Sequence, residues 1–398
     1  MTLNINVSPY GGEITACAKY ERADVSLPYF YLNRDAVMEP LLCDGKIVEA
    51  QIEIVRHPMQ DEYLVARVLV PTFYNYMEVR YRLKLTGKTG SWPYVREQIT
   101  PEFSLLRFET FCYPLFFDTW QDFRKAKFAQ CDISVTVPEG FTAISTVSTD
   151  GAGILNCTIA PYQQAEFSFG QVYFLPTIAA DSRQELEGIM QFAYDYMNAH
   201  FGHREFKPLT IATIPAGFGS FAITGSRTIF LEEGAFSKSE NLGFAVHEFI
   251  HLDWNAKPKD SVQRSRFFDE AFTCYFENRI MRRILQDDSY RRNSAEKAIA
   301  AVKDGKYAKV PICKYGEMEY GDLSYTIGAL CMEKLCSLLG EELFDAATAE
   351  FLRKHQETPA DFEDFCGTYV EFCGKENEIR LRKFFGEWLY SCEWMEVE

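Results

Sequence analysis

The sequence predicts an α+β fold, in which an all-β domain at residues 1–177 precedes a mainly helical domain at 178–398 that contains a small mixed sheet. Three observations predict it. Short runs rich in β-branched and aromatic residues fill the first part of the chain, and apolar residues recur at helical spacing in the second. The 398 residues, of which 47% are hydrophobic and 15% aromatic, are enough for a core in each domain.

The N-terminal domain is expected to consist of short strands arranged as a saddle-like sheet or a sandwich. Turn residues such as Asp44 and Gly45, or Gly87 and Gly90, separate runs that partly alternate between apolar and polar residues. The expected strands are 14–18, 46–55, 63–70, 77–85, 132–138, 153–159 and 165–174.

The pattern changes near Pro176, and we place the domain boundary there. A capping residue at Ser182 starts the first helix, and Ser239 is expected to cap a second helix that runs to about Trp254. Strands are expected at 209–214 and 227–231, on either side of a glycine-rich stretch. Further helices are expected at 267–285, 322–340, 341–355, 358–373 (with Thr358 as its cap) and around 381–389.

The overall charge argues against two classes of partner. The formal net charge is −16, so the phosphates of nucleic acids and anionic membrane surfaces would be repelled. The pairs Arg282-Arg283 and Arg291-Arg292 are interpreted as solvated helix ends rather than as a basic patch. No run of about 18 apolar residues occurs, so no transmembrane helix is expected.

The cysteines and the start of the chain predict a cytoplasmic protein. The first residues have neither a basic region nor a long apolar run, so no signal peptide is expected. The twelve cysteines are scattered singly, without a C-x-x-C pair. In a long chain without a secretion signal, such cysteines are usually reduced thiols.

The strongest chemical signal is the pentapeptide that begins at His247 and ends at His251, with Glu248 between them. Histidines four residues apart on a helix lie on one face and can bind one metal ion. Catalytic zinc sites use three protein ligands and leave a position for water, and two His with one Glu is a recurrent set. Glu270, on the next helix, is the candidate third ligand, and Glu248 is the candidate general base.

One alternative to this interpretation is a structural one. A core helix with two buried, hydrogen-bonded histidines would show the same pentapeptide.

A further carboxylate can lie near the same site. Glu277, seven residues after Glu270, returns to roughly the same helix face. It is either a carboxylate that contacts and orients a zinc-binding histidine without binding the zinc itself, or a solvated helix residue.

These residues resemble the gluzincin metallopeptidases of the aminopeptidase N family, which includes the leukotriene hydrolases. That family has H-E-x-x-H, then 18 residues, then a Glu in a W-L-x-E-G-F-A context, which Phe267–Thr273 matches loosely. The resemblance implies one zinc ion per chain, with His247, His251 and Glu270 as ligands and Glu248 as base. The stretch that begins at Tyr325 resembles the family's Y-x-K-G-A, so Tyr325 is implied to stabilise the oxyanion.

The resemblance extends to the N-terminal half, where the residues after Tyr113 are similar to the family's F-P-C-x-D-E-P. It therefore implies a saddle-like β domain followed by a thermolysin-like catalytic domain. The chain ends soon after Trp388, where larger members continue into a helical domain that roofs the active site. A more open cleft is expected here.

One departure concerns the end of the substrate. Family exopeptidases hold the substrate's amine with the Glu of G-A-M-E-N, and the best alignment places Ala222 at that Glu. Glu109, Glu232 and Glu233 are candidates to replace it. The backbone of the aligned stretch is still expected to pair with an extended substrate. The expected substrate-binding residues are Gly217, Gly219, Ser220, Phe221 and Ala222.

The sequence thus predicts a zinc metallopeptidase that hydrolyses peptide bonds, aminopeptidase-like and acting on short peptides. Two other hypotheses are kept. One is a peptide-binding module that retains the zinc site without efficient catalysis, although binding alone requires neither Glu248 nor Tyr325. The other is a hydrolase that uses the same zinc on a non-peptide substrate, as the leukotriene branch does on an epoxide.

Overall fold

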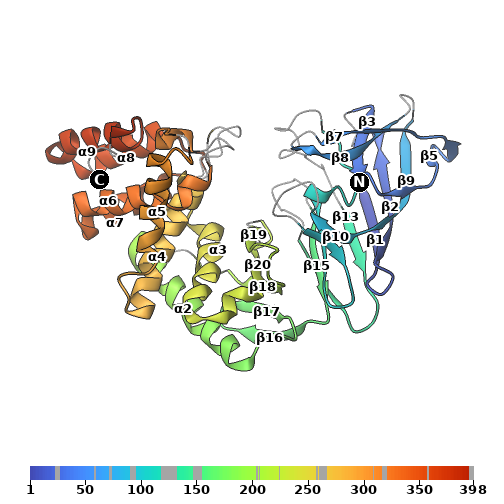
Figure 1. Cartoon of the computed structure of the whole chain (residues 1–398), viewed down its shortest axis with the longest axis horizontal. Coiled ribbons are helices and arrows are strands. Elements are labelled where there is room, and N and C mark those ends of the chain that lie inside the picture. The colour runs from blue at the N-terminus through green and yellow to red at the C-terminus, as the bar shows by residue number, and fades with distance from the viewer. Residues whose placement is uncertain are drawn as a thin grey trace. The chain divides into compact units, whose positions relative to one another are not determined.

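The computed structural model describes residues 1–393 apart from 23–26, 58–59, 71–73, 90–95, 118–131, 147–154, 203–204, 206, 224, 257–258, 260–266, 308, 316–320 and 356–357. The chain divides into two compact units, one formed by Met1–Ala179 with Pro208–Gly234 and the other by Ala180–Lys207 with Ala235–Glu398. The described strands belong to the first unit and the described α-helices to the second (Figure 1). The predicted domain boundary at residue 177 lies close to Ala179, where the chain passes from the first unit to the second. Residues 208–234, predicted as part of the catalytic domain, are grouped with the first unit here, and their assignment to that domain stays a prediction.

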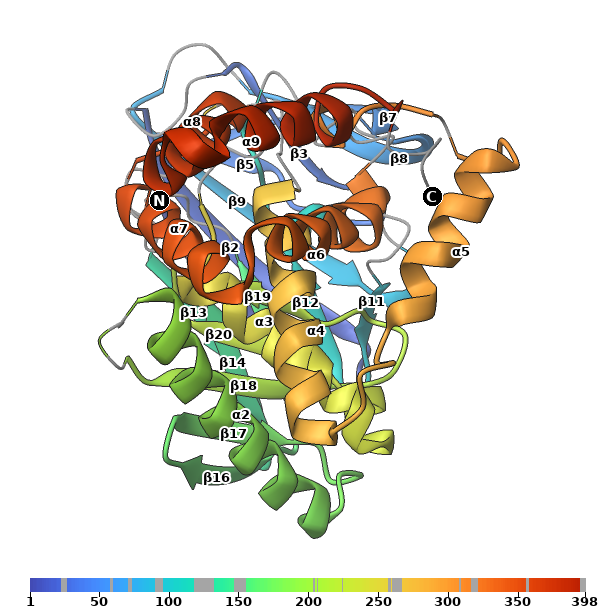
Figure 2. The ribbon, with the colours of Figure 1, turned by 90° about the vertical axis from the view of Figure 1, so that its left-hand side faces the viewer.

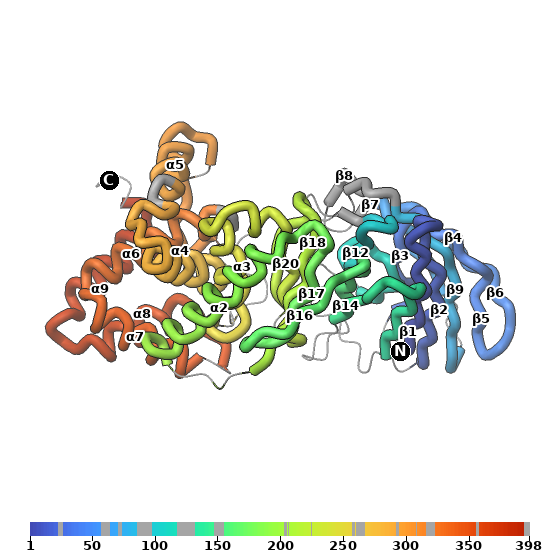
Figure 3. Tube along the Cα trace, turned by 90° about the horizontal axis from the view of Figure 1, so that it is seen from below, coloured from blue at the N-terminus to red at the C-terminus, as the bar shows by residue number. Residues whose placement is uncertain are grey.

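The largest sheet of the first unit is built from strands whose side chains alternate between core and solvent. In β2, for example, Ile14, Ala16, Ala18 and Tyr20 are buried, and the residues between them are more exposed. Figure 3 shows β1, β2 and β9 side by side, and their pairing is antiparallel. The described strands of this sheet run in the order β13 (Asp132–Thr136), β1 (Thr2–Ser8), β2 (Glu13–Glu21), β9 (Tyr76–Lys84), β5 (Leu41–Cys43) and β6 (Lys46–Val48), with β4 (Val37–Met38) paired to β9.

Two smaller sheets complete the all-β part. The predicted strand 46–55 is divided into β6 and β7 (Gln51–His57), and several short strands, β1 among them, were not predicted from the sequence. One sheet has the order β3 (Tyr29–Asn33), β8 (Gln60–Leu69) and β7 (Gln51–His57). The other has the order β10 (Thr86–Thr89), β11 (Arg96–Ile99), β12 (Ser104–Arg107), β15 (Asn156–Ala160) and β14 (Thr142–Thr146).

The fourth sheet is the small mixed sheet that the sequence predicts. Its order is β16 (Gln163–Phe167), β17 (Gly170–Phe174), β18 (Leu209–Ile214), β20 (Thr228–Glu232) and β19 (Phe221–Ile223). The three central strands are parallel, and the two outer strands pair antiparallel with their neighbours. Residues 165–174, predicted as one strand, are parts of the hairpin β16–β17.

The second unit is helical, and most of its helices lie where the sequence predicts them. α5 is the exception, since its residues were not assigned to any element. The α-helices are α2 (Ala180–Phe201), α3 (Gly243–Asp253), α4 (Phe272–Leu285), α5 (Arg292–Lys303), α6 (Ile327–Leu339), α7 (Glu341–Lys354), α8 (Phe362–Cys373) and α9 (Lys375–Trp388).

The predicted helix caps are wrong in detail. Ser182 lies inside α2, two residues after its start. Ser239 begins a 3₁₀ turn, Ser239–Leu242, that precedes α3. Asp361, not Thr358, caps α8, because its side chain accepts a hydrogen bond from the Asp364 backbone in a capping box.

α4 is the centre of the helical unit and contacts both α3 and α6 (Figure 2). An aromatic core surrounds Phe365 of α8, whose side chain has no exposed surface. Edge-on and tilted ring pairs of this kind add to the hydrophobic contribution. The rings in contact with Phe365 are Phe267, Phe268, Phe272, Phe351, Tyr369 and Phe385.

Two further properties follow from the described residues. Their eleven cysteines are free thiols. Among the helices that these residues form, none combines the length and apolar character needed to cross a bilayer.

Replacing Phe365 by alanine is expected to lower the free energy of unfolding of the helical unit by about 3–5 kcal/mol, because it leaves a cavity in the aromatic core. Phe372→Ala on the same helix is the matched control, since Phe372 is 43% exposed. Its effect should be about 1 kcal/mol or less. Urea unfolding followed by circular dichroism measures both, and equal effects would contradict this description of the core.

Candidate metal centre

α3 places His247 and His251 on one face, one helical turn apart. Their Nε2 atoms are 3.1 Å apart and their ring centroids are 4.8 Å apart. Phe249 and Ile250, which lie between them in the sequence, are buried. The helix is therefore anchored by its apolar side chains while the two imidazoles converge.

Glu270 reaches the same point from a π-helical turn, Phe267–Ala271, that leads into α4. Its Oε2 atom is 3.2 Å from Nε2 of His247 and 3.3 Å from Nε2 of His251. Phe267 and Phe268 fix the turn, because both rings are fully buried in the aromatic core. π turns occur frequently at functional sites, where the wider turn changes the direction of a side chain.

These three atoms fit a zinc ion. In a tetrahedral site with ligands about 2.0–2.1 Å from the metal, neighbouring ligand atoms are about 3.3 Å apart. The separations of 3.1–3.3 Å between the two Nε2 atoms and the Glu270 oxygen match that spacing. The donor set of two imidazoles and one carboxylate leaves one tetrahedral position for another group.

Each of the two histidines contacts a carboxylate on the side away from Glu270. Nδ1 of His247 is 3.2 Å from Oε2 of Glu277, and Nδ1 of His251 is 2.8 Å from Oδ1 of Asp269. Such carboxylate partners orient a metal-binding imidazole and fix its tautomer. Glu277 has no exposed side-chain surface, so the alternative of a solvated carboxylate does not apply, and its role in orienting a zinc ligand stays a prediction.

Asp269 was missed from the sequence, although it directly precedes Glu270. Its carboxylate also accepts a hydrogen bond from Asn255 Nδ2 at 2.8 Å. The Thr273 hydroxyl lies 3.3 Å from Nδ1 of His251 and donates to Asn255 Oδ1. A polar residue one helical turn after His251, followed by an acid beside the third ligand, is the signal that could have identified this group.

The carboxylates make the centre attractive to positive charge. Burial lowers the pKa of His251, but Asp269 and Glu270 outweigh burial and raise that pKa to about 10. Burial raises the pKa of Glu270, but its hydrogen bonds to the two imidazoles prevail and hold that pKa well below its ordinary value. A metal cation bound between the imidazoles would be stabilised by the same charges.

Glu248 and Tyr325 complete the centre. Glu248 is buried beside the two histidines, and burial raises the pKa of its carboxyl above the ordinary value. A raised pKa suits a group that accepts and later returns a proton. Tyr325 is 36% exposed, and its hydroxyl donates to Oε1 of Glu270 at 2.6 Å. The Tyr325 ring stacks on His247 at 6.1 Å between centroids.

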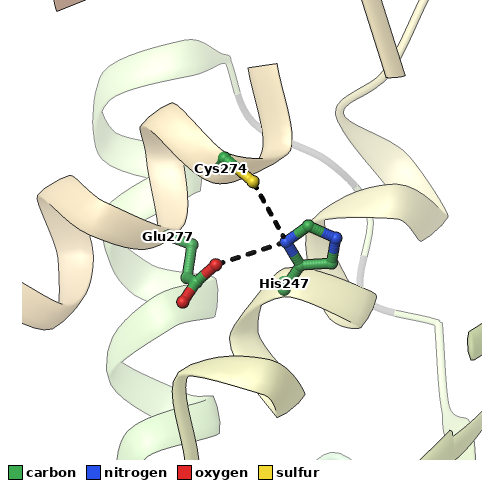
Figure 4. A group of neighbouring side chains, drawn as sticks. All are labelled: His247, Cys274 and Glu277. Atoms are coloured by element: carbon green, nitrogen blue, oxygen red, sulfur yellow. Dashed lines mark hydrogen bonds and ion pairs between the residues drawn. The ribbon is translucent and has the colours of Figure 1, made fainter. Parts of the chain in front are cut away.

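A second group of ligand-type side chains shares His247. Figure 4 shows Cys274 and Glu277 on its Nδ1 side, with Sγ of Cys274 at 3.8 Å. The Arg291 guanidinium binds both oxygens of Glu277, at 3.2 and 3.1 Å. A cation already occupies that carboxylate, so this group is a poor metal site.

The third such group in the described chain, His200 with Glu341 and Asp345, is also poorly suited. Arg279 pairs with both carboxylates. These contacts join α2, α4 and α7, so we interpret the group as a structural ion-pair network.

The predicted substrate-binding residues all lie in the first unit, whereas the zinc-type ligands lie in the second. Gly217 and Gly219 have φ values of 87° and 72°, which a residue with a Cβ adopts only with strain. Phe221 and Ala222 belong to β19, an outer strand of the mixed sheet, and Ser220 directly precedes it. Their role in substrate binding stays a prediction.

The candidate replacements for the amine-binding carboxylate each have a partner within the first unit. Glu232 accepts the Gly219 N–H at 2.5 Å. Glu233 accepts hydrogen bonds from the backbone of Ala216 and from the Thr177 hydroxyl.

Glu109 forms a two-point ion pair with Arg107, at 3.0 and 2.6 Å. The Arg107 guanidinium in turn lies 4.2 Å from the Phe221 ring centroid. A substrate amine would have to compete with Arg107 for Glu109.

Comparison with known proteins was made by sequence and by structure. No protein-family model matches the chain. A stretch of 155 residues is 30% identical to leucine aminopeptidase 2 of Chaetomium globosum, which covers 36% of this chain and only 25% of that protein. The match therefore spans a quarter of the length of that relative.

Solved structures match almost all of the chain. An aminopeptidase N family protein from Idiomarina loihiensis matches with a TM-score of 0.70 and 13% identity, over 98% of this chain and 76% of that one. Yeast LTA4 hydrolase gives 0.61 and 15%, over 98% and 67%. An M1 zinc metallopeptidase from Deinococcus radiodurans gives 0.55 and 14%, over 96% and 92%, and a mutant of it bound to the substrate Tyr-ser-ala gives 0.53.

At these identities the likeness establishes the fold. It confirms the α+β prediction of an N-terminal β part followed by a helical part with a small mixed sheet. The chain has the fold of the M1 aminopeptidase N and LTA4 hydrolase structures over nearly its whole length.

Proposed function

We propose that this protein is a zinc-dependent peptidase that hydrolyses peptide bonds, with His247, His251 and Glu270 as zinc ligands and Glu248 as general base. The observation that carries the proposal is the convergence of the three ligand atoms to within 3.3 Å of one another. Glu248 follows His247 directly on the same helix, and Tyr325 is hydrogen-bonded to Glu270. A zinc-binding structural site would need neither of the last two.

Bound zinc supplies Lewis acidity, which polarises a carbonyl and makes water easier to deprotonate. Glu248 takes the proton from the attacking water and transfers it to the leaving amine, for which its buried carboxyl with a raised pKa is suited. Tyr325 turns its hydroxyl from Glu270 toward the oxyanion and donates a hydrogen bond to it. Its 36% exposure leaves the ring accessible from one side.

The names of the similar proteins support the proposal. The relatives are named as aminopeptidases, a zinc metallopeptidase and a hydrolase, and one structure holds a tripeptide substrate. We therefore propose short peptides as substrates and aminopeptidase-like cleavage as the reaction.

Glu248→Gln is expected to lower kcat for a short peptide about 10²- to 10⁴-fold, because the amide cannot accept the proton. Bound zinc, measured by atomic emission, should stay at the wild-type ratio, since Glu248 is not a ligand. Glu371→Gln, a change to an exposed carboxylate on α8, is the control and should keep the wild-type rate. Full zinc content with an unchanged rate in Glu248→Gln would remove Glu248 from the mechanism.

Tyr325→Phe is expected to reduce kcat about 10²- to 10³-fold with a smaller change in KM, because the lost hydrogen bond acts mainly in the transition state. Tyr307→Phe is the matched control, as Tyr307 is 50% exposed and lies in the loop after α5. Steady-state kinetics on one peptide compares the two. A wild-type kcat in Tyr325→Phe would remove this tyrosine from the mechanism.

Peptides with a free amine are expected to be cleaved faster than their N-acetylated forms, by less than about tenfold. One charge-assisted hydrogen bond contributes about 1.5–3 kcal/mol, which is tenfold or more, and Ala222 cannot form it. Mass spectrometry of both peptides gives the ratio. Equal or faster cleavage of the blocked peptide would reject the aminopeptidase-like reaction, and a ratio near a hundred would mean that a carboxylate holds the amine.

A further inference from the structure

Both oxygens of the buried Glu277 carboxylate have polar partners. Its Oε1 accepts a hydrogen bond from the Tyr290 hydroxyl at 2.8 Å. The two terminal nitrogens of Arg291 contact the two carboxylate oxygens, at 3.1 and 3.2 Å. Its Oε2 also faces Nδ1 of His247 at 3.2 Å. A carboxylate without exposed surface requires such partners, and here they fix its orientation as well.

The turn between α4 and α5 brings Tyr290 and Arg291 to the same carboxylate. Arg291 has a φ of 53°, a left-handed conformation that residues other than glycine adopt rarely. Its guanidinium lies 4.9 Å from the Phe244 ring centroid and 5.4 Å from that of Tyr290. The interpretation of Arg291 as a solvated helix end is therefore wrong, since its side chain is only 29% exposed and is bound to Glu277.

Gly243, at the start of α3, leaves space for the hydrogen bond between Tyr290 and Glu277. A Cβ at Gly243 would lie 2.3 Å from the Tyr290 hydroxyl and 2.8 Å from Oε1 of Glu277. The Tyr290 hydroxyl also lies 3.2 Å from the backbone carbonyl of Glu240, just before that helix. The helix that carries His247 is thus joined directly to the residues that hold Glu277.

We propose that Arg291, supported by Tyr290, is a positioning residue for the zinc centre. Its two-point contact sets the Glu277 carboxylate so that Oε2 accepts the Nδ1–H of His247, which directs Nε2 of that imidazole toward the metal. The proposal rests on the proposed zinc site and extends it to a residue that contacts neither metal nor substrate. Partners of this kind typically change metal affinity 10- to 100-fold when they are replaced.

The test is a zinc titration of the metal-free protein against a chromogenic chelator. Arg291→Met should raise the zinc Kd about 10- to 100-fold. Arg291→Lys keeps the positive charge but cannot make the two-point contact with Glu277, so its zinc Kd should lie between those of Arg291→Met and the wild-type protein. Arg283→Met is the matched control, because Arg283 also lies near the end of α4, pairs with a carboxylate and packs over a tyrosine ring. The carboxylate that Arg283 pairs with, Glu341, is not in contact with His247 in the described structure. The zinc Kd of Arg283→Met should therefore equal that of the wild-type protein.

A double-mutant cycle separates positioning from folding. Glu277→Gln removes the charge that Arg291→Met would leave buried, so the double variant should fold even if the single variant does not. If Arg291 acts through Glu277, adding Arg291→Met to Glu277→Gln should change the zinc Kd less than twofold. An additive effect, or a wild-type Kd in Arg291→Met, would overturn the proposal. Failure of the wild-type protein to bind zinc would instead overturn the zinc site itself.

Discussion

The packing of α3 beside α4 forces four ionisable side chains into a region with little water. His247, Glu248, Glu270 and Glu277 are each 9% exposed or less. Burying such groups is unfavourable unless every charge has a partner. The described structure meets this requirement for the histidines, Glu270 and Glu277 by convergence: two imidazoles face one carboxylate oxygen, and further acids face their outer nitrogens. At Glu248, burial instead raises the pKa of the carboxyl. The same arrangement that makes the helices compatible with each other is the candidate set of zinc ligands.

The two histidines receive unequal support, and burial explains why. Glu277, behind His247, has no exposed surface and is paired with the Arg291 guanidinium. Asp269, behind His251, is 51% exposed at its side chain and is contacted by a neutral amide, Asn255. Water can stabilise an exposed carboxylate, so no cation is needed there, whereas a buried one depends on its own counter-charge. His247 is therefore expected to be the more rigidly held ligand.

The convergence of His247 and His251 could be predicted from the sequence, because helical spacing is a local property. Tyr325 came only from the family resemblance, since nothing in its local sequence distinguishes it from a packing tyrosine. Arg291 was misread because its role depends on a left-handed turn and on a partner one helix away. Asp269 was overlooked beside the third ligand. Contacts of this kind arise from tertiary packing, which periodicity does not encode.

The most direct measurement of the central claim is a crystal structure of the zinc-loaded protein with anomalous data collected at the zinc edge. The account predicts one peak, about 2.0–2.1 Å from Nε2 of His247, Nε2 of His251 and an oxygen of Glu270. A peak on the opposite side of His247, against Cys274 and Glu277, would contradict it. So would zinc-loaded crystals that show no peak between the two imidazoles.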